Sequence, residues 1–264
     1  MILHDQHIHT KYSEDSNAEI RDYFEKISKM GIKYFICCDH TDLDTVINKV
    51  DWRADYEACY QEALEISKDY PDIKVLRGAE IGYRKDKLQE INRIIQQHDF
   101  DLINLSVHDN GIYDYYMRNI FTPTNHDEIM NTYLDNIYDA LINMDNFDVL
   151  SHIDYGFKTL KLVDDKADFF KYEDKIREIM KLLIKKNKTL EINSKVQIFI
   201  DDNHLRRLLK LYYSLGGRKV SLSSDSHEVK MYYYNFDKYM KIIKECGFDY
   251  LSYFIKRKEY LYKI

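Results

Sequence analysis

Histidine and carboxylate side chains recur where short apolar segments of this chain end. Both side-chain types can bind a metal ion or move a proton. In chain order the segments are MILHDQHIH, YFICCDH, KVLRGAE, DLINLSVHD, DVLSHID and VSLSSDSH. Six such ends are hard to attribute to packing, because a buried charge is costly unless it is paired or bound to a metal. The pattern therefore predicts a metal centre.

The first segment has the spacing of a chelating site. Asp5, His7 and His9 alternate along a predicted strand, so their side chains share one face, whereas His4 points to the other face and is interpreted as structural. A single histidine in such a place is more often structural than a ligand, and it is the number of strand ends that favours a metal site. The further candidates at strand ends are His40, Glu80, His108, His152, Asp225 and His227.

These side chains meet only if the strands that carry them are parallel and adjacent. Segments with helical periodicity alternate with the strands, and KTLEINS adds one more strand, for a total of about seven. This alternation predicts an α/β fold closed into a barrel, because the carboxyl ends of all barrel strands share one face. An open doubly wound sheet is the alternative, but it would place its site at one switch point. Helices are expected at 17–30, 54–69, 87–97, 127–144, 172–186, 202–215 and 235–246.

Length, charge and cysteine content limit the remaining possibilities. The 264 residues contain no linker-like stretch and no repeat, which predicts a single domain over residues 1–264. A net charge of −6 argues against nucleic acid as a partner. No apolar stretch is long enough for a bilayer and no signal-type segment is seen, so a cytoplasmic protein without a membrane partner is expected. The four cysteines lack paired zinc spacing and are expected to be buried free thiols. The oligomeric state stays open.

The motifs DQHIHT, CCDH, GAEIGY, LSVHD, LSHID and SSDSH run in this order from Asp5 to about Glu228. Together they resemble the polymerase and histidinol phosphatase (PHP) superfamily, and most of all its histidinol-phosphatase branch. The resemblance implies a distorted TIM-like (β/α)7 barrel with a centre of three divalent metal ions, which can be zinc, manganese or iron. By resemblance, one metal would take His7, His9, Glu80 and Asp225; a second would share Glu80 and add His108 and His152; and a third would take His40, His227 and Asp15, in the loop after the first strand.

The resemblance also implies a metal-dependent phosphomonoesterase, with histidinol-phosphate phosphatase of histidine biosynthesis as the first hypothesis. Such an enzyme converts L-histidinol phosphate and water to L-histidinol and phosphate. The cations would remove the repulsion between the phosphate dianion and a metal-bridged hydroxide, which is the expected nucleophile. Asp225 and His227 are the candidates for proton relay at this nucleophile.

Two further functions stay open at this point. One is hydrolysis of another small phosphate or of phosphotyrosine, and the other is a metal-binding PHP domain without catalysis. The complete set of candidate ligands argues against the second, because carboxylates without metal are costly to keep together. DNA exonuclease activity is disfavoured by the acidic charge balance.

Substrate recognition is predicted from polar residues that follow strand ends. Arg84, Lys158 and Lys195 could neutralise a small phosphorylated substrate, with a solvated loop cation as the equal alternative for each. Asn193, two residues after Glu191, could contact a substrate amine or hydroxyl. Histidinol phosphatases commonly have a Gly/Arg-containing stretch after this strand, whereas this chain reads SKVQIF. The class of small phosphomonoesters is therefore better supported than the named substrate.

Overall fold

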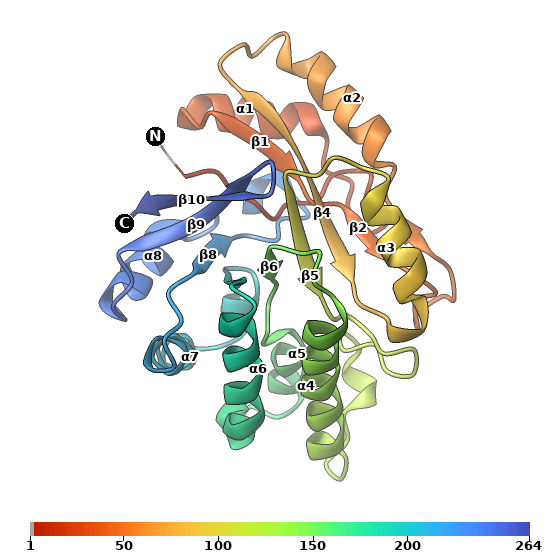
Figure 1. Cartoon of the computed structure of the whole chain (residues 1–264), viewed down its shortest axis with the longest axis vertical. Coiled ribbons are helices and arrows are strands. Elements are labelled where there is room, and N and C mark those ends of the chain that lie inside the picture. Colours follow the sequence, from red (N-terminus) through yellow and green to blue (C-terminus); the bar gives the residue numbers. More distant parts are fainter. Residues whose placement is uncertain (1–2) are drawn as a thin grey trace.

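A mostly parallel sheet forms the centre of the protein (Figure 1). The computed structural model describes residues 3–264. The strands follow one another in the order β3-β2-β4-β5-β6-β7-β8, with β1 paired to β4, and only the pairing of β2 with β3 is antiparallel within this sheet. The strands are β1 (Tyr34–Cys37), β2 (His40–Asp42), β3 (Trp52–Arg53), β4 (Lys74–Gly82), β5 (Leu102–Ser106), β6 (Val149–Leu150), β7 (Thr189–Asn193) and β8 (Val220–Ser223).

Helices alternate with these strands and lie around the outside of the sheet (Figure 1). Helix α6, for example, buries Ile176, Ile179, Met180 and Leu183, a spacing that puts all four on the face turned to the core. The predicted alternation of strand and helix is therefore confirmed. The helices are α1 (Ile20–Met30), α2 (Tyr56–Ser67), α3 (Leu88–Gln96), α4 (His126–Asn143), α5 (Tyr155–Val163), α6 (Glu173–Lys185), α7 (Asp202–Ser214) and α8 (Phe236–Glu245), with short 3-10 turns at Lys85–Lys87, Arg118–Ile120, Phe169–Tyr172, Val196–Ile198 and Val229–Met231.

Residues 7–9 close the sheet into a barrel. Ile8 forms a parallel bridge with Ser226, just beyond β8, and the His9 N–H donates to the Ser226 carbonyl at 2.8 Å. On the other side, the Cys38 N–H, just beyond β1, donates to the Ile8 carbonyl at 2.8 Å. The predicted first strand thus lies between the last strand and β1, and the open-sheet alternative is wrong. Met1 and Ile2, which the sequence assigns to this strand, lie outside the described residues.

A carboxyl-terminal hairpin, which the sequence did not predict, covers the amino ends of the strands. It consists of β9 (Tyr250–Ile255) and β10 (Lys258–Lys263). Backbone N–H groups of its turn, at Lys256 and Arg257, donate to Asp101, the residue before β5. The hairpin therefore lies at the opposite end of the barrel from the carboxyl strand ends.

Two further properties of the described chain bear on the predictions. All four cysteines are buried and free, as expected. Across residues 3–264, no helix has the length and apolar character needed to cross a bilayer.

Candidate metal centre

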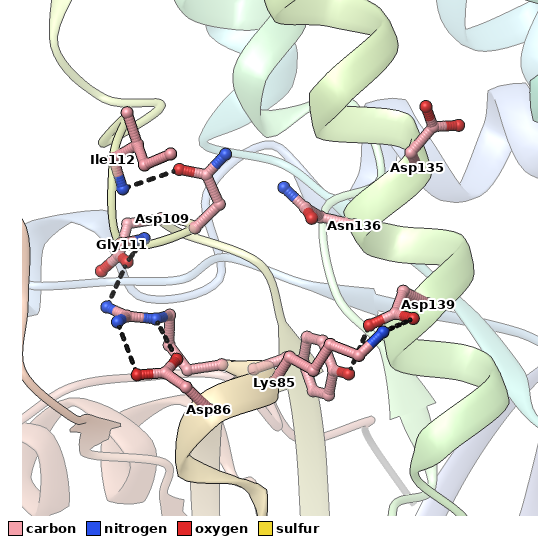
Figure 2. Close-up of a pocket in the computed structure, with 11 residues that line it drawn as sticks. Lys85, Asp86, Asp109, Gly111, Ile112, Asp135, Asn136 and Asp139 are labelled. Carbon is pink, nitrogen blue, oxygen red and sulfur yellow. Dashed lines mark hydrogen bonds and ion pairs between the residues drawn. The ribbon is translucent and has the colours of Figure 1, made fainter.

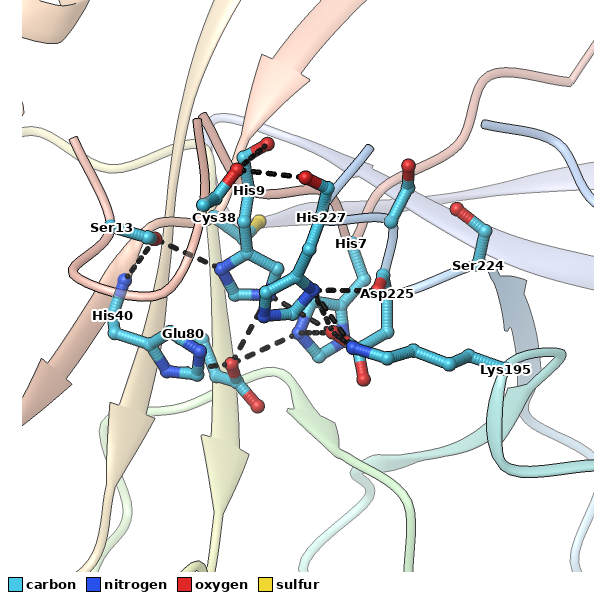
Figure 3. Close-up of polar contacts among 12 residues, drawn as sticks. His7, His9, Ser13, Cys38, His40, Glu80, Lys195, Ser224, Asp225 and His227 are labelled. Carbon is cyan, nitrogen blue, oxygen red and sulfur yellow. Dashed lines mark hydrogen bonds and ion pairs between the residues drawn. The ribbon is translucent and has the colours of Figure 1, made fainter. Parts of the chain in front are cut away.

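The carboxyl ends of the barrel strands bring the predicted ligands to one place. Figure 3 shows His7, His9, His40 and His227 around the carboxylates of Glu80 and Asp225, although they come from segments far apart in the sequence. Eight of the nine predicted ligands are largely buried, and only Asp15 has an exposed side chain, at 39%. A shared barrel face explains this convergence.

The most compact group contains His7, His9, Glu80 and Asp225. One ligand atom from each lies within 4.8 Å of the others, and all four residues are buried. His7 Nε2 is 3.2 Å from Glu80 Oε2, and His9 Nε2 is 3.1 Å from Asp225 Oδ1. Two imidazoles and two carboxylates turned toward one point form a donor set suited to a divalent cation.

Hydrogen bonds on the far side of the rings decide which nitrogens are free. His7 Nδ1 lies 2.7 Å from Glu191 Oε1, and an ionised carboxylate can only accept, so Nδ1 carries the proton. His9 Nδ1 donates to Ser13 Oγ at 3.1 Å, and this hydroxyl donates to Asp39 at 2.8 Å. Both Nε2 atoms therefore present lone pairs to the centre, which is the usual arrangement of metal-binding histidines.

The atoms at the centre of this group lack hydrogen-bond partners within the described chain. His7 Nε2, His9 Nε2 and Glu80 Oε2 are all buried and without such a partner. Lone pairs and a carboxylate about 3 Å apart repel one another unless a proton or a cation lies between them. The residues present thus fit a metal ion.

Glu80 connects this group to a second one. Its Oε1 atom is 2.9 Å from His152 Nε2 and 3.2 Å from His108 Nε2. Burial opposes ionisation of Glu80, but positive charge on the nearby His7, His40 and His108 holds the pKa of its carboxyl well below the ordinary value, and a bound cation would supply this charge in place of the protons. Glu80 is therefore an ionised carboxylate with one oxygen directed to each group, as a bridging ligand requires.

A third group contains Asp15, His40 and His227. Asp15 Oδ2 is 3.0 Å from His227 Nε2, and Asp15 Oδ1 is 3.7 Å from His40 Nε2. The rings of His40 and His227 also lie close to His9, with ligand atoms of all three within 4.8 Å of one another. The nine predicted ligands thus form one continuous cluster. Their division among individual metals stays a prediction.

Sequence reasoning missed Asp42, a buried carboxylate of this cluster. Asp42 Oδ1 is 2.8 Å from His108 Nδ1 and Oδ2 is 3.1 Å from His40 Nδ1. The glycine of the GAEIGY motif, Gly82, was a sequence signal for a closely packed neighbour, because a Cβ there would come within 1.8 Å of Asp42 Oδ1. Only glycine on β4 leaves room for this carboxylate, and Asp42 also alternates with His40 along β2.

Two of the predicted ligands have unusual backbone conformations. The φ angle is 21° at His152 and 52° at Asp225, in the left-handed region that residues with a Cβ seldom adopt. Such conformations cost on the order of 1–3 kcal/mol each and persist where the surrounding structure imposes them, often at functional sites.

A cavity of about 340 Å³ opens over the cluster and contains two of the predicted substrate-binding residues, Lys158 and Lys195. Lys195 Nζ is 2.8 Å from His227 Nδ1 and 3.6 Å from Asp225 Oδ1. Lys158 is buried with Nζ 4.1 Å from the centre of the Tyr155 ring, and desolvation lowers its pKa to about 8. Both ammonium groups thus face the space above the metal ligands.

The other two predicted substrate-binding residues do not line this cavity. Arg84 lies at a neighbouring pocket of about 730 Å³, where its guanidinium donates to Asp86 and Asp109, two residues seen in Figure 2. Asn193 is fully buried and donates to Glu191 at 3.2 Å and to Asp225 at 3.3 Å. The geometry gives both residues a role in holding other side chains.

Comparison with known proteins points in one direction. The sequence model of the family described as "PHP domain" matches residues 5–195. The chain is 28% identical over 261 residues to a histidinol-phosphatase of Lactococcus lactis (95% of this chain, 93% of the relative), and 27% identical to a probable histidinol-phosphatase of Clostridium acetobutylicum (93% and 94%). A crystal structure of histidinol phosphate phosphatase from Lactococcus lactis, complexed with zinc, L-histidinol and phosphate, superposes with a TM-score of 0.86 at 26% identity, covering 97% of this chain and 98% of that one.

Proposed function

We propose, from the premise that this chain belongs to the PHP domain family, that it is a histidinol-phosphate phosphatase. It is a histidinol-phosphatase-like enzyme, its fold is that of the family, and the resemblance expected from its motifs is confirmed. The proposed reaction converts L-histidinol phosphate and water to L-histidinol and inorganic phosphate. The observation that carries this proposal is the buried cluster of free imidazole nitrogens and carboxylates under a cavity that also holds two lysines.

The proposed metal ligands are those expected from the sequence, His7, His9, Asp15, His40, Glu80, His108, His152, Asp225 and His227, which would hold three divalent ions such as zinc, manganese or iron. Ions bound there would neutralise the phosphate dianion and lower the pKa of water so that it can attack phosphorus. Zinc in the crystal structure of the Lactococcus lactis protein supports a metal-loaded state.

The side chains around this cluster would bind the phosphate and move the proton. Lys158 and Lys195, which line the same cavity as the predicted metal ligands, would neutralise the nonbridging phosphate oxygens. Lys195 lies in the SKVQIF stretch after β7, where histidinol phosphatases commonly have a Gly/Arg-containing stretch. Its ammonium group supplies a cation at this strand end. Asp225 and His227 are the candidates to accept a proton from the attacking water, since their side chains line the same cavity.

The size of the cavity favours a small phosphate monoester over a polymer. About 340 Å³ is in the range of sites for small molecules. A small phosphate other than histidinol phosphate is therefore the second candidate, since the cation that follows β7 is Lys195 and not the arginine common in histidinol phosphatases.

Steady-state phosphate release tests the proposal. The purified protein, loaded with zinc or manganese, is assayed with L-histidinol phosphate, p-nitrophenyl phosphate and a panel of sugar and amino-acid phosphates. We expect kcat/KM for L-histidinol phosphate to exceed every rival by at least about a hundredfold, which corresponds to about 2.7 kcal/mol of selective transition-state binding. Uniformly slow turnover would overturn the named substrate and keep the chemistry, whereas no turnover by the fully metallated protein would overturn both.

A further inference from the structure

The loop after β5 forms a tight hairpin that places Asp114 at the cavity over the predicted metal ligands. It contains the sequence HDNGIYDY. The Tyr115 N–H donates to the His108 carbonyl at 2.9 Å, and the backbones of Asp109 and Asp114 form an antiparallel β-bridge. Its turn is fixed by Asn110, whose side chain accepts from the N–H groups of Ile112 and Tyr113. A metal ligand, His108, thus stands at one end of this hairpin and Asp114 at the other.

Asp114 is a buried carboxylate that forms no direct ion pair among residues 3–264. Its exposed fraction is 6%, and it lines the cavity over the metal ligands. One oxygen, Oδ1, accepts from the Tyr116 N–H at 2.8 Å, and within the described chain no hydrogen bond or ion pair uses the other oxygen. Burial raises the pKa of Asp114, and the carboxylates of Asp109 and Asp42 add to this, while the Tyr116 N–H and the charge of the nearby His108 oppose it only in part.

Other buried carboxylates of the barrel do have such partners. Asp109 accepts from Arg84 at 2.9 Å, and Asp154 lies 3.1 Å from His204 Nε2. Lys158 faces the same cavity and its charge is attracted by Asp114, but among the described residues the two form no ion pair within 4.0 Å. An unpaired carboxylate in a partly closed site is costly, so its presence there calls for a cation that arrives from outside.

The walls of the cavity near this hairpin are aromatic. Trp52, Tyr116 and Tyr155 line it, and Lys158 Nζ lies 4.1 Å from the Tyr155 ring centre and 5.3 Å from that of Tyr116. Aromatic faces attract organic cations and pack against flat rings. The cavity therefore has metal ligands and lysines suited to phosphate, and a carboxylate with aromatic walls suited to an ammonium group.

We propose that Asp114 binds the ammonium group of the substrate, so that the site selects phosphate monoesters of amino alcohols over matched esters without an amine. This inference rests on the proposed phosphatase function and names a residue for its specificity. The carboxylate would act in binding, and it would take no part in attack on phosphorus.

The test compares two esters that differ only in the amine, L-histidinol phosphate and 3-(imidazol-4-yl)propyl phosphate. Asp114→Asn keeps the size of the side chain and the oxygen that accepts from Tyr116. We expect this variant, loaded with metal, to lose about thirtyfold in kcat/KM for the amine ester and to stay within about threefold of the wild type for the other. Asp135→Asn, an exposed change on α4, is the matched control and leaves both values unchanged.

Equal losses on both esters, or no loss on the amine ester, would overturn the inference. Calorimetric binding of L-histidinol to the metal-loaded proteins gives a second readout that needs no turnover. We expect about thirtyfold weaker binding by Asp114→Asn and equal binding of the deaminated alcohol by both proteins. If the wild type hydrolyses neither ester, the phosphatase proposal fails, and the calorimetry still decides the role of Asp114, since equal binding of L-histidinol would refute it.

Discussion

At the scale of single residues, the centre depends on side chains that hold the histidine rings. Glu191 accepts from His7 Nδ1 at 2.7 Å and from the His152 N–H at 2.9 Å, and Ser223 also donates to it. Because Glu191 can only accept, it fixes the proton of His7 on Nδ1 and leaves Nε2 free. Which nitrogen of His7 is available to a metal thus depends on Glu191, which contacts the opposite side of the ring.

Glu191→Gln is expected to weaken metal binding about 10- to 100-fold, because the amide no longer enforces the tautomer of His7. Zinc affinity measured by competition with a chromophoric chelator checks this. Glu65→Gln is the matched control, since Glu65 is exposed on α2 and pairs only with Lys68 among the described residues. An unchanged affinity in Glu191→Gln would contradict the role given to Glu191.

His4 predicts a pH dependence of stability. It is fully buried against Tyr34 and Tyr253, neither ring nitrogen has a hydrogen-bond partner in the described chain, and desolvation lowers its pKa to about 3. The unfolded chain therefore binds a proton below about pH 6.5 that the folded protein does not bind. The stability linked to His4 is complete above this pH and is lost as the pH falls toward 3.

His4→Phe keeps a ring in this place and removes the titration. Between pH 6.5 and 4.5, we expect the free energy of unfolding of the wild type to fall more steeply than that of the variant, by about 1.4 kcal/mol per pH unit. Urea denaturation at several pH values measures both slopes. Parallel slopes would show that His4 is protonated in the folded state.

The sequence could predict which residue types gather at the centre, but the residues that hydrogen-bond to the predicted ligands were harder to recognise. Strand ends with His, Asp or Glu were visible because such residues are rare on buried strands. Asp42 and Ser13 look like ordinary loop residues until the fold shows their contacts to His108 and His9. The same holds for Arg84, which has the character of a phosphate ligand in the sequence and contacts carboxylates in the structure.

At the scale of elements, Arg84 joins the loops that follow three strands. Its guanidinium donates to the Asp44 carbonyl beyond β2, to Asp86 beyond β4 and to Asp109 beyond β5. Asp42 lies in β2 and Glu80 in β4, and His108 follows the end of β5 by two residues. Arg84 therefore fixes the distances between loops whose side chains meet at the centre.

Arg84→Gln is expected to lower the free energy of unfolding by about 3 kcal/mol, because Asp109 stays buried without its cation. Arg84→Lys keeps the charge and loses the forked geometry, so a smaller loss of about 1–2 kcal/mol is expected. Urea denaturation at constant pH gives both values. Lys85→Gln, which removes an exposed cation paired with Asp139, is the control and should change stability by less than about 0.5 kcal/mol.

The elements that the sequence predicted are those with long apolar periodicity. Helix α5 was missed because it begins directly after the motif LSHID, with His152 and Asp154 read only as site residues. The hairpin β9–β10 was missed because its tyrosines and lysines alternate less clearly than the apolar residues of the barrel strands. Its stability comes from contacts with the barrel, which local sequence does not reveal.

At the scale of the whole molecule, one side chain links the β9–β10 hairpin to the chain just before residues 7–9, which close the barrel. Gln6 is buried, its Nε2 donates to the Phe254 carbonyl at 3.0 Å, and its Oε1 accepts from the Phe254 N–H at 2.9 Å. The Gln6 side chain thus makes with β9 the pair of hydrogen bonds that a neighbouring strand would make. It also holds the chain one residue before His7.

Gln6→Ala is expected to lower the free energy of unfolding by about 2–4 kcal/mol, because two buried backbone groups lose their partners. Chemical denaturation measures the change. Gln61→Ala, on the exposed face of α2, is the control and should stay within about 0.5 kcal/mol of the wild type. Equal stability of the two variants would mean that the hairpin is held by its apolar contacts alone.

The closing of the barrel by residues 7–9 also affects how the protein is made. A ribosome releases His7 and His9 early, and Asp225 and His227 only when most of the chain has been synthesised. Until then His7 and His9 lack the carboxylate of Asp225 and the pairing with Ser226, although Glu80 and β1 have already been made. The donor set of His7, His9, Glu80 and Asp225 is therefore incomplete during most of translation, and we expect the centre to take its final metal once the segment after β8 has docked.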